Sequence, residues 1–264
     1  MKISLIFISI YSFFAFSFDI NAQKTPVPNY YKSIDFSDKK TLFIQLSKLI
    51  TKTHKTKLKY SPDTWQALKK TDEDPNNPNK ILLMYGTNNM DQDITNDLSR
   101  DKNKGGNKKG NWNREHVYPR SMGKPNLGYT GAGADIHMLR PSDVKQNGKR
   151  GNLPFEDAKG AARKINKSWY PGDRWRGDVA RIVMYMYVRY GSKADPKRVA
   201  KNGFISSRPF PELFLQWNAQ DPVDFFEKNR NEKVYLIQGN RNPFIDNPYI
   251  AHLLWGGAIP QKNW

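Results

Sequence analysis

Apolar side chains recur at three- and four-residue spacing along two long stretches of the chain, residues 37–54 and 176–190. This spacing places the apolar groups on one face of an α-helix. We predict an amphipathic helix over the first stretch. The second stretch is richer in methionine and tyrosine and is predicted to be the central core helix.

Further helices are predicted where a polar residue is followed by proline. Proline fits the first position of a helix, where its missing N–H costs nothing. The pattern occurs at Ser61-Pro62, Asp221-Pro222 and Asn247-Pro248. With an additional apolar segment, the predicted helices cover residues 61–70, 211–217, 221–231 and a short stretch from 247.

Strand-like segments are few and short. Residues 81–85 are apolar, whereas residues 71–80 are rich in Asp, Asn and Pro and are predicted to form a loop. A second strand-like run ends near Glu115 and His116, and a third covers residues 134–139 before a short helical stretch. The pattern therefore predicts an α+β fold, a mostly helical single domain with a few short strands.

The first 22 residues have the features of a secretory signal peptide. A lysine near the start is followed by an apolar stretch and a small-residue end at Asn21-Ala22. An uncleaved anchor is the alternative, but the apolar run is shorter than the roughly 20 residues that a membrane span needs. We expect a secreted protein, extracellular or periplasmic, whose domain is residues 23–264 and which has no membrane association after cleavage.

The charge is strongly positive, with a formal net charge of +18 and a pI of about 9.8. Removing residues 1–22 takes away Lys2 and Asp19, so the net charge does not change. Such a charge favours nucleic acid as partner, with envelope polyanions or anionic lipid as alternatives. Nothing in the sequence implies a protein partner. The chain has no cysteine, which excludes a thiol nucleophile and a thiolate zinc site.

Residues 111–155 concentrate the residue types that hydrolysis of a phosphodiester needs: a base for water, a cation on the phosphoryl oxygens and stabilisation of the leaving oxygen. His116 can act as the base, and Glu115 and Asn147 are oxygen donors suited to Mg²⁺, although Mn²⁺ or Ca²⁺ would accept the same oxygens. A lone histidine on a strand is often only structural, and an asparagine near a helix end is often a cap. Spacing alone leaves both interpretations open.

In these residues the chain resembles the endonuclease I family of secreted and periplasmic bacterial nucleases, which belongs to the His-Me finger, or ββα-metal, group. The matching motifs are Asn113-Arg114-Glu115-His116 with Pro119, Asp135-Ile136-His137 with Leu139 and Pro141, Asn147-Gly148-Lys149-Arg150 with Asn152, and the block from Gln238 to Asp246.

The resemblance implies a ββα-metal unit at about residues 111–155. Glu115 matches the metal-binding acid of the family, His116 the general base and Asn147 the second metal ligand. It implies cleavage of DNA, and also RNA, without sequence preference, in which a metal-bound water protonates the leaving 3′ oxygen and 5′-phosphate ends result.

Other residues of these motifs are assigned supporting roles. Asp135 and His137 are predicted to be structural support, with catalysis by His137 as the alternative. Successive side chains on a regular strand point to opposite faces, so we predict that the strand ends or bulges at Glu115 and His116. The candidate phosphate-binding residues are Arg114, Arg150, Asn152 and Arg241.

A non-catalytic, basic nucleic-acid-binding or surface protein on the same scaffold is the alternative hypothesis. It would retain DNA in EDTA, where the enzyme would stop cutting. A zinc hydrolase is a weaker idea, because the sequence has no H-E-x-x-H motif. If His116 is the base, its reference pKa of about 6.5 predicts that activity falls as acid protonates it, whereas a profile flat to about pH 4 would count against this role.

Overall fold

The computed structural model describes residues 27–87, 90–203 and 209–263. The chain forms two units, Met1–Ser33 and Ile34–Trp264. In the first unit the described part contains one turn of helix, α1 (Val27–Tyr30). The expected leader, residues 1–22, lies outside the described residues. All elements below belong to the second unit.

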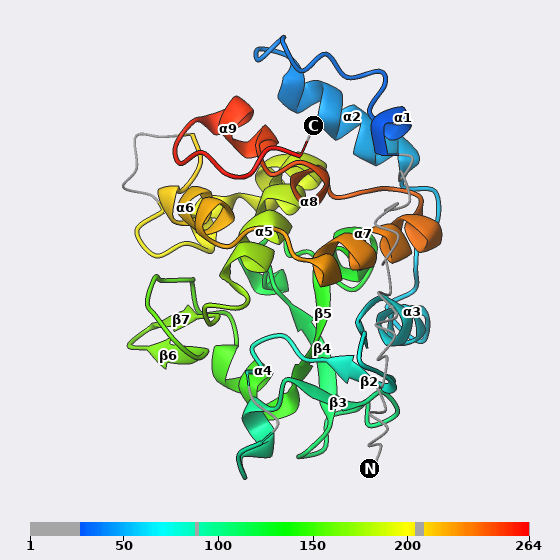
Figure 1. Cartoon of the computed structure of the whole chain (residues 1–264), viewed down its shortest axis with the longest axis vertical. Helices are drawn as coiled ribbons and strands as arrows, with labels where there is room; N and C mark the ends of the chain where they lie inside the picture. The colour runs from blue at the N-terminus through cyan, green and yellow to red at the C-terminus, as the bar shows by residue number, and fades with distance from the viewer. Residues whose placement is uncertain (1–26, 88–89, 204–208, 264) are drawn as a thin grey trace, which may run out of the picture. The chain divides into compact units, whose positions relative to one another are not determined.

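Both long helices predicted from the apolar spacing are present. Helix α2 (Leu42–Thr53) buries Leu42, Leu46 and Ile50, and α5 (Arg176–Tyr190) is buried along most of its length. Figure 1 shows α5 among the other helices, and it packs against α2 and α6. The remaining α-helices are α3 (Asp63–Thr71), α4 (Val144–Arg150), α6 (Glu212–Gln220), α7 (Phe225–Gln238), α8 (Pro243–Asp246) and α9 (Ile250–Trp255).

The helix predicted from Asp221 begins instead at Phe225. Asp221 accepts a hydrogen bond from the backbone N–H of Gly177 (2.9 Å), so its carboxylate serves the start of α5. Asp224 caps α7 in its place by accepting from Glu227 N. The helix continues to Gln238, where Gly239 adopts the left-handed conformation (φ 88°) that often ends helices.

The strands form small antiparallel sheets. One sheet joins β1 (Glu73–Asp74), β2 (Asn77–Leu82) and β3 (Ser99–Asp101). The loop predicted for residues 71–80 is therefore partly wrong, because β1 and β2 pair there, and the predicted strand 81–85 is strand only at its first two residues. A second sheet pairs β6 (Arg163–Ile165) with β7 (Ser168–Tyr170).

The third sheet pairs β4 (Trp112–His116) with β5 (Leu139–Asp143), and α4 follows β5 directly. The strand predicted over 134–139 is wrong in position. Residues Gly131–Ala134 form a short 3-10 helix, η3, and the strand begins only at Leu139. Asp135 causes the difference, because its side chain and carbonyl oxygens accept backbone N–H bonds from the next residues and hold a turn.

Short 3-10 helices complete the second unit. They are η1 (Ile94–Asn96), η2 (Arg120–Met122), η4 (Gly191–Ala194) and η5 (Pro196–Arg198). The predicted α+β class is confirmed. None of the helices in the described part of the chain is long and apolar enough to cross a membrane.

Buried ion pairs connect distant segments of the helical region. Arg181 on α5 pairs with Glu227 on α7 (Nε–Oε1 2.8 Å). Asp72 Oδ1 accepts from both Arg140 Nε (2.7 Å) and Arg230 Nε (2.9 Å). These contacts hold β5 against α3 and α7, and thereby position the start of α4.

Candidate active site

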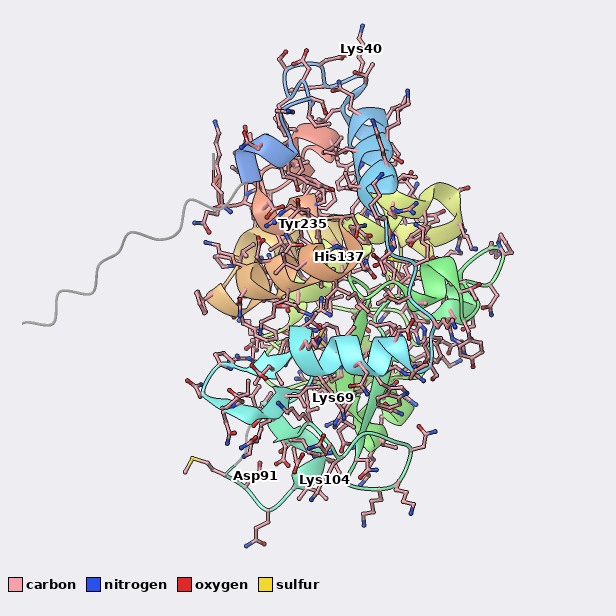
Figure 2. All side chains as sticks on the ribbon, turned by 90° about the vertical axis from the view of Figure 1, so that its right-hand side faces the viewer. Lys40, Lys69, Asp91, Lys104, His137 and Tyr235 are labelled. Carbon is pink, nitrogen blue, oxygen red and sulfur yellow. The ribbon has the colours of Figure 1, made fainter. Side chains whose placement is uncertain are left out.

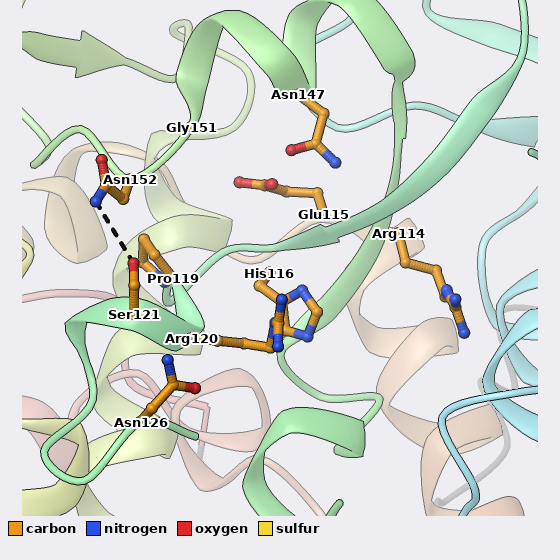
Figure 3. Close-up of a pocket in the computed structure, with 10 residues that line it drawn as sticks. All are labelled: Arg114, Glu115, His116, Pro119, Arg120, Ser121, Asn126, Asn147, Gly151 and Asn152. Atoms are coloured by element: carbon orange, nitrogen blue, oxygen red, sulfur yellow. Dashed lines mark hydrogen bonds between the residues drawn. The ribbon is translucent and has the colours of Figure 1, made fainter. Parts of the chain in front are cut away.

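A polar pocket of about 230 Å³ lies where β4 ends beside α4. It brings together the three residues for which the sequence predicts catalytic and metal-binding roles, as Figure 3 shows. The lining residues are Arg114, Glu115, His116, Pro119, Arg120, Ser121, Asn126, Asn147, Gly151 and Asn152.

Strand β4 ends at His116, and both Glu115 and His116 line the pocket at this end of the strand. The β4–β5 ladder is regular up to the pair His116↔Leu139 and contains no bulge. Of the two predicted solutions, the strand therefore adopts the first, an end at these residues. Glu115 is buried, whereas His116 is partly exposed toward the opening.

The imidazole of His116 is held by a backbone carbonyl. Its Nε2 lies 3.0 Å from Gly133 O. A carbonyl oxygen can only accept, so Nε2 carries the proton in this contact and Nδ1 keeps a free lone pair. The ring also stacks on Tyr60, with the centroids 5.5 Å apart.

The environment of His116 strongly favours its neutral form. Burial lowers its pKa to about 3, and the positive charges of Arg120, Arg114 and Arg150 act in the same direction, against the Gly133 hydrogen bond. The acid limb expected near pH 6.5 should therefore lie well below that value.

Glu115 presents a carboxylate whose two oxygens have different surroundings. Oε1 accepts from Tyr85 OH (2.8 Å) and faces Arg150 Nε at 3.4 Å. Both contacts involve the same oxygen, and Glu115 is one of the residues that line the pocket. Burial raises the pKa of Glu115, while Arg150 and the Tyr85 hydrogen bond lower it.

Asn147 reaches the pocket from α4, whose first turn is fixed by Asp143 accepting from Lys145 N and Gln146 N. Its Nδ2 donates to Asn113 Oδ1 on β4 (2.7 Å). This bond fixes the amide orientation and leaves Oδ1 as the group that faces the pocket. In Figure 3 the amide of Asn147 and the carboxylate of Glu115 lie on the same side of the pocket.

The donor set suits a hard cation. Glu115 and Asn147 would supply two protein oxygens, and Mg²⁺ typically keeps several waters besides one or two such ligands. Within the described ranges no group of three or more His, Asp or Glu side chains could hold a metal, so a zinc site with several histidines is not formed there. The residues present therefore fit magnesium better than zinc.

Arg114 and Asn152 line the pocket, as predicted for phosphate-binding residues. The guanidinium of Arg114 stacks over Tyr60 at 3.5 Å from the ring centroid and donates to Thr64 Oγ1 (3.0 Å). Asn152 lies 3.5 Å from Ser121 Oγ. Arg120 is a further cation at this pocket.

Arg150 and Arg241, which were also predicted to bind phosphate, are buried and do not line the pocket. Arg150 is fully buried and donates to the carbonyls of His116 and Val117, so it braces the end of β4. Arg241 is 2% exposed and pairs with Asp246 and Glu232. Neither lines the pocket, because buried carboxylate and carbonyl acceptors already hold both guanidiniums.

Asp135 and His137 are buried outside the pocket. Asp135 accepts from Tyr185 OH (2.7 Å), Tyr190 OH (2.8 Å) and the amide of Gln238. The imidazole of His137 bonds to Asn240 O (3.1 Å) and not to Asp135, which binds instead the backbone N–H of His137. Figure 2 places His137 among the helices, away from Lys104. Both residues thus contact buried groups of the protein and lie outside the pocket.

Three residues that shape the pocket escaped the sequence analysis. Tyr85 binds Glu115, Asn113 orients Asn147, and Gly133 orients His116. Asn113 lies within the quoted motif and could have been suspected from its position beside Arg114. Tyr85 and Gly133 act through contacts between segments far apart in the chain, for which the hydrophobic pattern holds no signal.

Known proteins match most of this chain. The family model described as endonuclease I matches residues 38–249. An extracellular ribonuclease of Bacillus amyloliquefaciens is 43% identical over 213 residues, which cover 76% of this chain and 69% of that protein. The extracellular ribonuclease of Bacillus subtilis (strain 168) is 44% identical with the same coverage. A periplasmic deoxyribonuclease of Aeromonas hydrophila is 30% identical over 123 residues, 42% of this chain and 47% of that protein. The chain therefore belongs to the endonuclease I family and is a hydrolase that acts on nucleic acids.

Proposed function

We propose that this protein is a secreted, divalent-metal-dependent endonuclease that hydrolyses phosphodiester bonds of DNA and RNA without sequence specificity and leaves 5′-phosphate ends. One observation carries the proposal: the imidazole of His116, with its Nε2 on the carbonyl of Gly133, shares a pocket with Glu115 and Asn147. Binding alone would not require this arrangement, because lysines suffice to hold phosphates.

His116 acts as the general base in this mechanism. Its Nδ1 takes a proton from a water molecule, and the resulting hydroxide attacks phosphorus as the bond to the 3′ oxygen breaks. The positive charge that develops on the imidazole is stabilised by the hydrogen bond from Nε2–H to Gly133 O. The leaving 3′ oxygen takes up a proton from a second water molecule, and the imidazolium returns its proton to the solvent, so the products are a 3′-hydroxyl and a 5′-phosphate.

Glu115 and Asn147 would hold the divalent cation. When bound, such a cation supplies charge stabilisation for the phosphoryl oxygens and for the leaving oxygen. Tyr85 and Asn113 keep the two ligands oriented by their hydrogen bonds. The order β4, β5, α4, with both ligands and the base beside one pocket, supports assigning these elements as a ββα-metal unit.

Arg114 and Arg120 would hold the phosphates on either side of the scissile bond. Contacts to phosphate carry no sequence information, which agrees with cleavage at any sequence. Relatives named ribonuclease and deoxyribonuclease support both substrates, and the words extracellular and periplasmic in their names support secretion by means of residues 1–22.

Digestion of plasmid DNA and of RNA tests the proposal. The protein is incubated with Mg²⁺, Mn²⁺ or Ca²⁺, or with EDTA, and the new ends are assayed for a 5′-phosphate by their capacity for ligation. We expect cleavage of both polymers only with a divalent cation, and ends that ligate directly. Cleavage in EDTA, or ends with a 3′-phosphate, would contradict the mechanism; retention of DNA without cutting under any cation would favour the binding protein.

A further inference from the structure

Tyr129 is a large aromatic side chain that the structure leaves 53% exposed beside the candidate active site. It lies in the segment between η2 and η3, four residues before Gly133, whose carbonyl orients His116. Exposed aromatic rings next to a phosphate-binding pocket are the groups on which nucleobases stack in proteins that bind single strands.

Contacts on the protein side hold the ring of Tyr129 in place. The guanidinium of Arg120 lies 3.6 Å from its centroid, and Arg120 Nη2 donates to its hydroxyl (2.7 Å). Tyr60 contacts it with a centroid distance of 4.8 Å and stacks in turn on His116. A continuous set of ring contacts thus runs from the exposed Tyr129 to the base.

Tyr129 lies in a tight loop whose ends, Gly128 and Gly133, approach each other closely. Gly128 and Gly131 on either side have positive φ angles of 68° and 54°. A Cβ atom on Gly133 would lie 1.9 Å from Gly128 O, so the backbone atoms at the two ends of this loop are in close contact. The ring is therefore presented on a defined loop, and a base that stacks on it does not have to order the protein first.

We propose that Tyr129 is a stacking site for an unpaired nucleobase next to the scissile phosphate, so that the enzyme prefers single-stranded segments. The inference rests on the proposed nuclease function and specifies its substrate. Arg120 lines the pocket and also contacts the ring of Tyr129. Arg120 can therefore bind a phosphate of the substrate while Tyr129 stacks on the base of an adjacent nucleotide.

The preference for single strands follows from the cost of unstacking. A base in a duplex must leave its partner and its neighbours before it can lie on a protein ring, and this cost is smallest where the base is already unpaired. Every base has a flat face, so stacking on Tyr129 adds strand discrimination without sequence discrimination.

Binding in EDTA measures stacking separately from cleavage. The probes are a short fluorescent oligothymidylate and an oligomer of the same length and charge built from abasic sugar phosphates. We expect the wild-type protein to bind the base-bearing strand on the order of tenfold more tightly than the abasic strand, and Tyr129→Ala to lose most of this ratio. Tyr129→Phe should keep it, because stacking needs the ring and not the hydroxyl.

Phe225→Ala is the matched control, since Phe225 is an exposed aromatic residue (74%) at the start of α7 that does not line the pocket. It should keep the wild-type ratio. With Mg²⁺ present, Tyr129→Ala should also lower the ratio of single-strand to duplex cleavage by a similar factor.

Several results would overturn the proposal: no discrimination against the abasic strand by the wild-type protein, an unchanged ratio in Tyr129→Ala, or a lost ratio in Tyr129→Phe. The last would show that the hydroxyl acts only by positioning Arg120. Failure of the nuclease function is distinguishable, because the base-dependent ratio would persist in binding while no strand is cut under any divalent cation.

Discussion

At the scale of single residues, the position of Glu115 depends on groups that the sequence does not connect with it. The hydroxyl of Tyr85 donates to Glu115 Oε1, and Arg150 Nε lies 3.4 Å from the same oxygen. Under the proposed function Glu115 is a metal ligand, and mutation of a residue that orients a metal ligand typically costs about 10- to 100-fold in metal affinity or activity. Tyr85 is therefore a positioning residue.

Replacing Tyr85 by Phe removes this hydrogen bond and keeps the buried ring. We expect the Mg²⁺ concentration for half-maximal activity to rise by about 10- to 100-fold, with a smaller effect at saturating Mg²⁺. Tyr170→Phe is the control, because it also deletes a hydroxyl that binds a carboxylate, that of Asp173, away from the pocket. An unchanged Mg²⁺ requirement in Tyr85→Phe would refute the positioning role.

His137 makes stability depend on pH. Burial holds its pKa at about 4, below the ordinary 6.5, although Asp135 acts in the opposite direction. Between these values the unfolded chain binds the proton and the folded chain does not, so this contribution to stability is present above pH 6.5 and is lost as the pH falls toward 4.

The loss amounts to up to about 3 kcal/mol of unfolding free energy. His137→Gln keeps an amide donor for Asn240 O and has no titration, so its stability should fall less steeply than that of the wild type over this window. Denaturant unfolding at several pH values measures the difference. If the unfolding free energies of the two proteins depend on pH in the same way, His137 is not the cause of the loss.

Some of the residues predicted for the site line the pocket, and others do not. Glu115, His116 and Asn147 were identified from motif and chemistry, and the structure brings them to one pocket. Arg150 and Arg241 carry the same charge as Arg114 and also lie in motifs that match the family, yet both are buried and bind acceptors of the protein. Burial depends on what packs around a residue, and the local sequence does not contain that information.

At the scale of elements, the segment before β5 holds the imidazole of His116 in place. Gly133 offers its carbonyl to His116 and touches Gly128 through backbone atoms. A methyl group cannot be accommodated between them without movement of the loop.

We expect Gly133→Ala to lower kcat by on the order of 10²-fold, because a displacement of about 1 Å at a catalytic group has an effect of this size. Gly148→Ala is the matched control: Gly148 lies in α4, and a Cβ there meets no atom within 4 Å. That change should raise helix stability by roughly 0.5–1 kcal/mol. If Gly133→Ala turns over as fast as the wild type, the carbonyl does not orient His116.

Long helices were predicted better than short strands. The apolar spacing of α2 and α5 is a local signal repeated over several turns, so both helices appear where it predicted them. The pairing of β1 with β2 and the late start of β5 depend on contacts with other segments. These strands have only two to six residues, which is too short for the alternation of apolar and polar side chains to identify them reliably.

At the scale of the whole second unit, buried charges join elements that are far apart in the chain. Asp72 follows α3 and binds Arg140 on β5 and Arg230 on α7. The carboxylate thus supports the strand that leads into α4, the helix that carries Asn147. No sequence pattern indicated this cluster, because its members come from three separate segments.

Asp72→Asn would remove the negative charge that pairs with the buried guanidiniums of Arg140 and Arg230. Breaking a buried ion pair typically costs about 3–5 kcal/mol, so we expect a loss of this size in unfolding free energy. Asp101→Asn, at an exposed position on β3, is the control and should change stability by less than about 0.5 kcal/mol. Equal melting temperatures for the two variants would show that the cluster contributes little.

The central claim is that His116 is the base of a metal-dependent nuclease, and the most direct test compares the wild type with His116→Ala. Cleavage of plasmid DNA and RNA is measured with Mg²⁺, and DNA affinity is measured in parallel. We predict that His116→Ala binds DNA like the wild type and cuts it about 10²- to 10⁴-fold more slowly. Cleavage by the variant at the wild-type rate, with Mg²⁺ still required, would contradict the role of His116.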